Sequence, residues 1–282
     1  SLANRRFYRQ GLNWAVAGFK MVSGGDVRAL TSISKIPNTW VASNAWEKAF
    51  RAWNKQQMNA IDEAGAESAV ARFRDFKVFA DADHATLGIP NNLLPFAHSP
   101  GEWEHSLIVL PNADIDPVSG ARTEPRENML HMVGANEVIV GSTASRGIIE
   151  GYADSRAYPQ SPDPVSPAID SGNNWMRAMF DVGNDNEEVT DNATDRNDNL
   201  PYPQVEYPGG QTQAALLQQH DREFISATTI GGTTRLKGGN FPCGLIKISL
   251  VNLTAEEISP QLYLDLIPGN HRGYLCEPMT EM

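Results

Sequence analysis

Two alternating runs near the C-terminus constrain the fold more than any other feature. Residues 244–253 (GLIKISLVNL) and 261–269 (QLYLDLIPG) each place apolar side chains at every second position. The apolar positions are Ile246, Ile248, Leu250, Leu262, Leu264 and Leu266. A period of two is typical of a strand with one buried face, and we predict that these six residues share a core. The linker TAEEISP is too short for a helical crossover, so the strands are antiparallel neighbours or lie in two facing sheets.

Other short runs extend the same pattern over the chain. Segments rich in β-branched and aromatic residues occur at 73–81, 105–111, 136–141 and 222–230. Long polar insertions at 154–174 and 181–210 separate them, and loops of this length are uncommon unless they have a function. We therefore predict a mainly β fold, an antiparallel single jelly-roll β-sandwich with long inter-strand loops.

The N-terminal part has a helical period instead. Residues 12–22 carry apolar groups at i, i+3, i+4 and i+7, and residues 45–61 carry an aromatic stripe after the cap-like Ser43 and Asn44. The positions are Leu12, Ala15, Val16 and Phe19 in the first, and Trp46, Phe50, Trp53 and Ile61 in the second. We predict one domain, 1–282, with a helical N-terminal region (1–66) and a β-sandwich (73–282).

Two Gly-Gly pairs in TTIGGTTRLKGGNFPCGLIKISL (228–250) invite comparison with a phosphate-binding loop. Such a loop needs G-x-x-x-x-G-K-[ST] opening a helix, whereas β-branched and apolar residues follow these glycines and Pro242 prevents a helix. We predict turns or bulges at the glycines, and an intervening strand that has Arg235 and Lys237 on one face.

Residues with catalytic or metal-binding chemistry are few. None of the six histidines stands at metal-ligand spacing, and no nucleophile elbow is present. His84 lies between carboxylates in DADHA (81–85), where a loop histidine is a simpler interpretation than a metal or acid–base cluster. Cys243 and Cys276 are far apart and are expected to be free thiols. A triad assembled from distant segments leaves no sequence signal, but nothing indicates one, and we predict that the protein is not an enzyme.

The acidic segment 184–199 offers oxygen ligands but lacks the EF-hand order. We expect it to be exposed and non-catalytic, with no tight cofactor and at most weak Ca²⁺ binding where subunits meet. No apolar run approaches the length of a membrane span, so no membrane partner is expected.

The charge distribution separates the N-terminus from the rest. A formal net charge of −11 argues against nucleic-acid binding by the whole surface. However, Arg5, Arg6 and Arg9 occur with no acidic residue before Asp26. They are either the solvated start of a helix or the end of a basic arm that binds nucleic acid.

Three blocks of the chain resemble the capsid proteins of small circular single-stranded DNA viruses that encode a rolling-circle replication protein. The blocks are IPNTWVASNAWEKAFRAW (36–53) leading into FRDFKVFAD (73–81), TTIGGTTRLKGGNFPCGLIKI (228–248), and LIPGNHRGYLCEPMTEM (266–282). The resemblance implies a single jelly roll of eight antiparallel strands and a closed icosahedral shell of many copies. It also implies a basic N-terminal arm facing a single-stranded genome, and a location in the virion, with assembly inside the host cell.

The resemblance leaves the loop-rich middle of the chain unsupported, and it departs from the family pattern at the arm, of which only three arginines are present. The alternative interpretation is a lectin-like, carbohydrate-binding β-sandwich. In that case exposed loop aromatic residues would stack on sugars, and the acidic segment would hold Ca²⁺. The candidate aromatic residues are Trp103, Trp175, Tyr202 and Tyr207.

The capsid interpretation makes a prediction about the gene. Because the 282 residues carry −11, the charge that neutralises a polyanionic genome should come from Lys- and Arg-rich residues encoded before Ser1. Deleting that arm should leave a folded body that no longer retains nucleic acid, and in the full chain retention should weaken steeply with salt because each contact releases a counterion. Sequencing upstream of Ser1 is the check, and a neutral or acidic extension would contradict the prediction.

Overall fold

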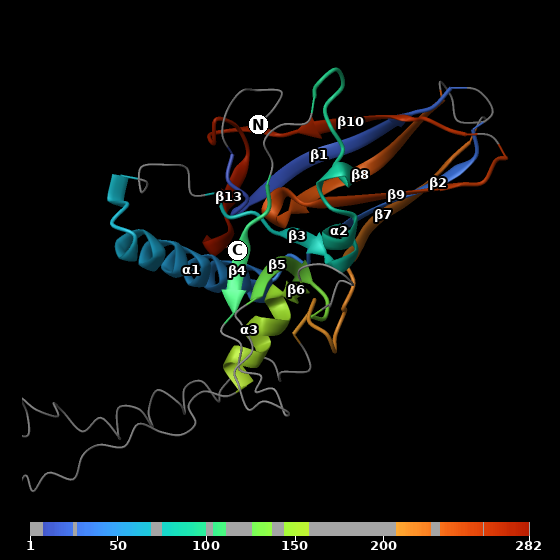
Figure 1. Ribbon diagram of the computed structural model, residues 1–282. Coiled ribbons are helices and arrows are strands. Elements are labelled where there is room, and N and C mark those ends of the chain that lie inside the picture. Colours follow the sequence, from blue (N-terminus) through green and yellow to red (C-terminus); the bar gives the residue numbers. More distant parts are fainter. Residues whose placement is uncertain are drawn as a thin grey trace, which may run out of the picture.

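The computed structural model describes residues 8–24, 27–68, 75–99, 104–110, 126–136, 144–157, 207–226, 232–255 and 257–281. Within them the protein is mainly β, and its largest feature is a sandwich of two antiparallel sheets (Figure 1). The strands of the first sheet are β1 (Leu12–Val22), β8 (Thr233–Phe241), β10 (Gln261–Leu266) and β13 (Cys276–Pro278). Those of the second are β2 (Ala29–Lys35), β7 (Gln218–Ile225) and β9 (Ile246–Asn252).

The central strand of each sheet comes from the N-terminus. In the first sheet β1 pairs with β8 on one side and with β10 and β13 on the other, and in the second β2 lies between β7 and β9. The inner faces meet in a core of Val16, Phe19, Ile33, Leu236 and Phe241, all fully or almost fully buried. The two C-terminal runs are therefore strands, as predicted, and they lie in two facing sheets.

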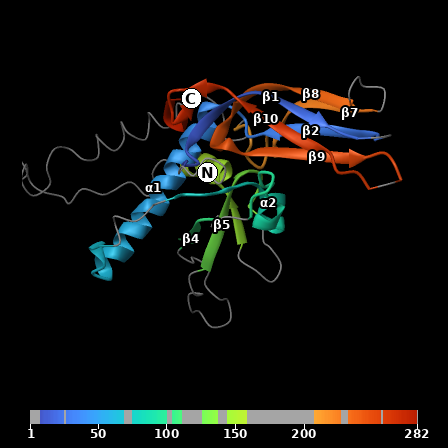
Figure 2. The same ribbon diagram turned by 90° about the horizontal axis from the view of Figure 1, so that it is seen from above.

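A second group of elements covers one end of the sandwich (Figure 2). It comprises α1 (Trp40–Glu63), α2 (Ala82–Leu87), α3 (Ile148–Ala157), and the strands β3 (Phe79–Asp81), β4 (Leu107–Leu110), β5 (Arg126–Val133) and β6 (Ala144–Gly147). In this small sheet β5 pairs with all three neighbours, parallel to β3 and β6 and antiparallel to β4. Aromatic residues of α1 pack in one hydrophobic core with residues of α3 and the small sheet. The aromatic stripe at 45–61 is therefore on a helix, as predicted.

Short elements complete the described chain. They are the 3₁₀ turns η2 (Ile89–Asn91), η5 (Pro242–Gly244) and η6 (Met279–Glu281), and the two-residue strands β11 (Pro268–Gly269) and β12 (Gly273–Tyr274). The cap of α1 is Thr39, whose hydroxyl accepts from the Ala42 backbone N–H, so this helix begins earlier than Ser43 and Asn44 suggested.

The helix predicted at 12–22 is wrong, because this segment is the strand β1. A β-bulge lies between Val16 and Gly18 on the side that pairs with β10. The extra residue puts Val16 and Phe19 on the same buried face, although they are three positions apart. A bulged strand thus imitates the spacing of a helix. In its described residues, the region 1–66 contains two strands and one helix.

The Gly238–Gly239 pair is not a turn between strands, since both residues lie inside β8. Gly238 faces the bulge of β1, where a Cβ would overlap the carbonyl oxygens of Val16 and Ala17. The glycine is therefore required by the close approach of two backbones. Arg235 and Lys237 are exposed on one face of β8, as predicted.

The predicted burial of Leu250 and Leu264 is also wrong. Leu264 pairs with the buried Phe19, and Leu250 pairs with the buried Thr31, so both point to the inner faces. However, β9 and β10 are the outer strands of their sheets, and the two side chains are 37% and 44% exposed. A substitution such as Leu264→Asp is consequently not expected to prevent folding.

Of the other predicted strands, 105–111 contains β4 and 222–230 overlaps β7, which begins four residues earlier at Gln218. The part of the run 73–81 that the structure describes, 75–81, is a strand over Phe79–Asp81. The run at 136–141 lies outside the described residues except for Asn136.

A matched pair of substitutions tests this distribution of burial. Ile33→Ala removes a fully buried side chain from the central strand β2, and we expect a loss of about 2–5 kcal/mol in the free energy of unfolding. Leu264→Ala, on an outer strand, should cost less than about 1 kcal/mol. Urea titrations of both variants measure the difference, and equal losses would contradict the assigned positions.

Candidate functional site

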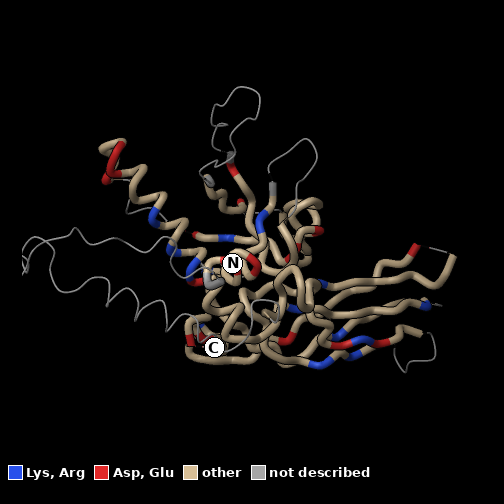
Figure 3. The backbone as a smooth tube through the Cα atoms, turned by 90° about the horizontal axis from the view of Figure 1, so that it is seen from below, with Lys and Arg blue, Asp and Glu red and all other residues tan. Residues whose placement is uncertain are grey.

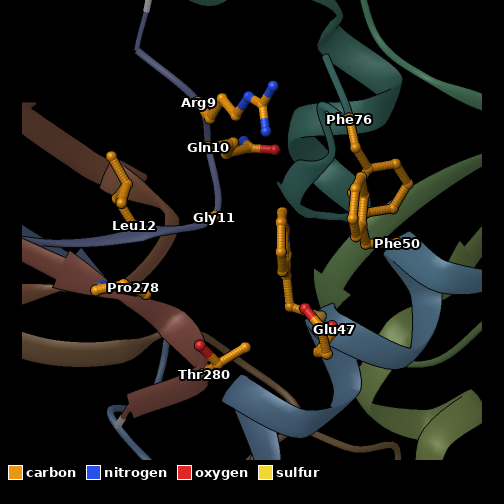
Figure 4. A pocket seen from close by; sticks show the side chains of 10 residues that line it. Arg9, Gln10, Gly11, Leu12, Glu47, Phe50, Phe76, Pro278 and Thr280 are labelled. Carbon is orange, nitrogen blue, oxygen red and sulfur yellow. The ribbon is translucent and has the colours of Figure 1, made fainter. Parts of the chain in front are cut away.

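The described part of the predicted basic arm ends at a pocket. Arg9 is exposed and lies just before β1, while Arg5 and Arg6 lie outside the described residues. The pocket has a volume of about 230 Å³ and opens between the start of β1, helix α1 and the C-terminal segment (Figure 4). Its lining residues are Arg9, Gln10, Gly11, Leu12, Trp46, Glu47, Phe50, Phe76, Pro278 and Thr280.

Local contacts hold the pocket in shape. The Gln10 side chain donates to the Val78 carbonyl (2.9 Å) and accepts from the Val78 N–H (2.6 Å), which ties the N-terminal segment to the chain that enters β3. The Trp46 ring stacks on Phe50, with ring centroids 5.4 Å apart, and meets Phe76 edge-on. Gly11 leaves room for the indole, since a Cβ there would overlap the ring.

The chemistry of the pocket is that of a binding surface. One wall is aromatic, the Arg9 guanidinium and the Glu47 carboxylate contribute opposite charges, and the lining contains no His, Cys or Ser. Glu47 is paired with Arg51 on α1 at 2.7 Å. The Trp46 indole N–H is buried without a hydrogen-bond partner among the described residues.

The DADHA segment has a structural role. Asp81 caps α2 by accepting from the His84 backbone N–H (2.9 Å), and its other oxygen accepts from Lys247 Nζ (2.7 Å). Asp83 also pairs with Lys247, at 3.2 Å. His84 Nδ1 accepts from the Ala80 N–H, so Nε2 carries the proton and donates to Asn92 (2.8 Å). Asp81, Asp83 and Lys247 thus join the small sheet and α2 to β9. His84 lies within α2, so its interpretation as a loop histidine is wrong.

A Ser–His pair that the sequence does not reveal lies between β5 and β6. Ser145 and His131 Nδ1 are 2.6 Å apart, and His131 Nε2 is 3.0 Å from the Ala135 carbonyl oxygen. Because a carbonyl only accepts, Nε2 carries the proton and the Ser145 hydroxyl donates to Nδ1. Both side chains are completely buried, so the pair stabilises the small sheet and is closed to a substrate.

Both cysteines are free thiols, as expected. Cys243 is buried, its Sγ lies 3.8 Å from the Met279 sulfur, and desolvation raises the pKa of its thiol far above the ordinary value. Desolvation also raises the pKa of Cys276. A nucleophilic cysteine needs the opposite shift, toward the thiolate.

Metal and membrane sites are not found in the part of the chain that the structure describes. No group of three or more His, Cys, Asp or Glu side chains there could hold a metal ion. The acidic segment 184–199, where weak Ca²⁺ binding was expected, lies outside that part. None of the described helices is long and apolar enough to cross a membrane.

The surface feature that sequence reasoning missed is a set of exposed apolar side chains at the end of α2 and in the residues that follow it. We call residues 87–96 the apolar segment, and its exposed members are Leu87, Leu93, Leu94 and Phe96. Phe96 is 91% exposed and stands in a turn closed by the His98 N–H and the Pro95 carbonyl, in which Ala97 has a φ of 59°. The run IPNNLLPF has neither period, so its pattern could not separate core residues from surface residues.

A comparison of the chain with family models, with curated proteins and with solved structures finds no match.

The Lys247 contacts predict a pH dependence of stability. Desolvation lowers the pKa of Lys247, but the hydrogen bonds and charges of Asp81 and Asp83 outweigh it, so the net shift is upward. The folded-state pKa then exceeds the unfolded value of about 10.4, and the contribution is complete at neutral pH and lost as the pH rises through the folded pKa. Because the side chain is partly exposed, we expect about 1 kcal/mol at most.

Urea unfolding of Lys247→Met measures this contribution. The variant should be less stable than the unmodified protein near neutral pH, and the difference should shrink as the pH rises above the unfolded value of about 10.4 and through the raised folded pKa. Lys55→Met, at an exposed position on α1, is the control and should show no such change. A difference that stays constant with pH would contradict the assignment.

Proposed function

We propose that this protein is the subunit of a viral capsid, which assembles in many copies into an icosahedral shell around a single-stranded genome. The observation that carries the proposal is the apolar segment. Large apolar side chains at a loop tip are exposed in the single chain, and contact with a second subunit would remove them from water. In this role the protein needs no cofactor and no catalytic residue.

The apolar segment has a defined conformation. Backbone hydrogen bonds at Gly88, Asn91 and Asn92 form successive turns, and Asn92 is held by His84. Ala97 adopts the left-handed conformation within the turn that the His98 N–H closes on the Pro95 carbonyl. A rigid loop that presents Phe96 loses little entropy on association, which suits a contact surface.

The outer strands β9 and β10 offer a second surface for association. Among the described residues each pairs with a neighbouring strand on one side only, so its other edge is a surface along which another chain could add a strand. Exposed apolar side chains lie on or just beyond these strands, namely Leu250, Val251, Leu253 and Leu264. Both strands lie on the same side of the sandwich (Figure 2). Subunit contacts along this side would cover the edges and the apolar groups together.

The finer topology that we propose is a jelly roll. Three consecutive strand pairs, β1–β2, β7–β8 and β9–β10, each pass from one sheet to the other. The first pairs with the third in both sheets, β1 with β10 and β2 with β9, which is how a ribbon wound around a core pairs with itself. A jelly roll has eight strands, and among the described residues the sandwich contains six long ones, namely β1, β2, β7, β8, β9 and β10.

The genome would be held in part by a basic N-terminal arm that includes Arg5, Arg6 and Arg9. Arg9 itself is exposed, while its neighbours Tyr8 and Gln10 contact the body of the protein, so the arm would begin before Tyr8. The expected location is the virion, after assembly inside the host cell. A host receptor would bind the outer surface of the shell.

The lectin alternative has less support. Tyr207, one of its four aromatic residues, is only 1% exposed and packs against Trp40 and Tyr152 in the core, so it cannot stack on a sugar. Trp103, Trp175 and Tyr202 lie outside the described residues.

Particle size tests the proposal directly. The purified protein should form closed particles with a mass on the order of megadaltons, visible in electron micrographs, rather than a 30.9 kDa monomer. Phe96→Glu should prevent assembly while leaving the unfolding temperature within a few degrees, because the side chain makes few contacts in the single chain. Phe96→Leu, which keeps an apolar group, is the matched control and should assemble.

Two outcomes would contradict the proposal. One is an unmodified full-length protein that remains a monomer or small oligomer under all assembly conditions, particularly if it binds immobilised sugars. The other is that Phe96→Glu assembles as efficiently as Phe96→Leu. This result would show that the apolar segment is not a subunit contact.

A further inference from the structure

The outer face of the β10–β1–β8 sheet carries cations and an exposed aromatic ring in adjacent positions. Lys20 on β1 pairs with Tyr263 on β10 and with Arg235 on β8, so the three side chains form a line across three strands. Lys237 lies two residues from Arg235 on the same face. We call Lys20, Arg235, Lys237 and Tyr263 the basic row.

Strand alternation places the basic row on the face away from the core. The neighbouring residues Phe19, Met21 and Leu236 are buried between the sheets, which turns Lys20, Arg235 and Lys237 outward. The Lys20 ammonium lies 5.8 Å from the centre of the Tyr263 ring, within the range of a cation–π contact. The ring is 50% exposed, and its hydroxyl donates to Gln261 Oε1 (3.0 Å), which fixes its orientation.

The charge of this face is opposite to that of the whole chain. Asp265 shares the face, opposite Gly18 and in line with Lys237, so three positive charges stand against one negative charge. Asp221 on β7 accepts from the Lys237 backbone N–H (2.7 Å), which lowers the pKa of that carboxyl group, and the charge of Lys237 lowers it further. A second carboxylate therefore lies beside the row, at Lys237, and Lys237 itself is exposed. Figure 3 shows blue and red segments along the strands of the sandwich, so the basic row is a local feature in a chain that carries −11.

We propose that the basic row binds single-stranded nucleic acid. Arg235 and Lys237 are about 7 Å apart along the strand, so each can reach a separate phosphate. The exposed face of Tyr263 can stack on an unpaired base, with Lys20 supporting the ring. Sheets that combine exposed aromatic residues with cations bind single strands in this way, and stacking requires a base that is free of a duplex. This inference rests on the proposed function in one respect, that the ligand is the enclosed genome. It differs from the expectation from the sequence that the body retains no nucleic acid without the basic arm, because the basic row lies on the body itself.

The first experiment removes two cations. Anisotropy of a fluorescent oligothymidylate of about 20 nucleotides reports its affinity over a range of salt concentrations. Arg235→Gln/Lys237→Gln should weaken binding at least about tenfold and reduce the slope of log K against log salt by about 1.4, since each phosphate contact contributes about 0.7. Arg51→Gln/Lys55→Gln on α1 is the matched control, with the same residue types and charge change, and should keep the slope of the unmodified protein.

The second experiment separates stacking from charge. Tyr263→Ala should weaken oligothymidylate binding about five- to hundredfold, because stacking of one base contributes about 1–3 kcal/mol. Tyr263→Phe keeps the ring, loses only the hydrogen bond to Gln261, and should bind as the unmodified protein does. Inorganic polyphosphate, which has charge but no bases, should compete poorly.

The inference is overturned if the unmodified protein does not bind the oligonucleotide, or if the Arg51/Lys55 variant loses as much affinity as the Arg235/Lys237 variant. It is also overturned if Tyr263→Ala binds normally or polyphosphate competes as well as the oligonucleotide. These outcomes are distinct from failure of the proposed function. If the protein binds through the basic row but never forms particles, the proposed shell function is refuted. If particles form and the Arg235/Lys237 variant packages as much nucleic acid as the unmodified protein, only the proposed role of the basic row is refuted.

Discussion

The pairing of the β1–β2 ribbon with two ribbons near the C-terminus is the interaction on which the sandwich depends. Each N-terminal strand is the centre of a sheet, and its partners lie about two hundred residues away in the chain. Closing such a long loop costs entropy that only the completed core offsets. The missing side chain at Gly238 allows the backbone of β8 to approach that of the central strand β1 at its bulge.

The polar groups with catalytic potential are used within the fold. Asp81, Asp83 and Lys247 hold β9 to the small sheet, and His131 and Ser145 satisfy each other inside it. Cys243 is surrounded by apolar groups and a methionine sulfur. Buried polar groups cost free energy unless they are paired, and here the pairing explains their presence without a reaction.

The exposed apolar and basic groups of the surface, in contrast to the buried polar groups, are accessible to other molecules. Apolar groups stand exposed at the apolar segment and along β9 and β10, where contact with further chains would stabilise the assembly more than the single subunit. The basic row lies on the outer face of the β10–β1–β8 sheet, the face that does not pack against the core. An assembled shell would separate these surfaces, with subunit contacts on one and nucleic acid on the other, which is the physical sense of the two proposals together.

The sequence by itself determined β9 and β10, whose apolar residues alternate, and the aromatic helix α1, whose apolar residues follow the helical period. An element with one buried face repeats apolar residues at its own structural period, and this repeat is visible in the sequence. It also determined that Arg235 and Lys237 share a face, and that the cysteines are unpaired. Only the tertiary structure decided that 12–22 is a strand, since a bulge shifts the period toward that of a helix. It alone decided that Leu250 and Leu264 are exposed, that Tyr263 lies beside Lys20, and that Ser145 meets His131. Alternation along a strand predicts which face of the sheet a side chain occupies. Its burial and its neighbours depend on whether the strand is central or at the edge of the sheet, and on which strands pair with it.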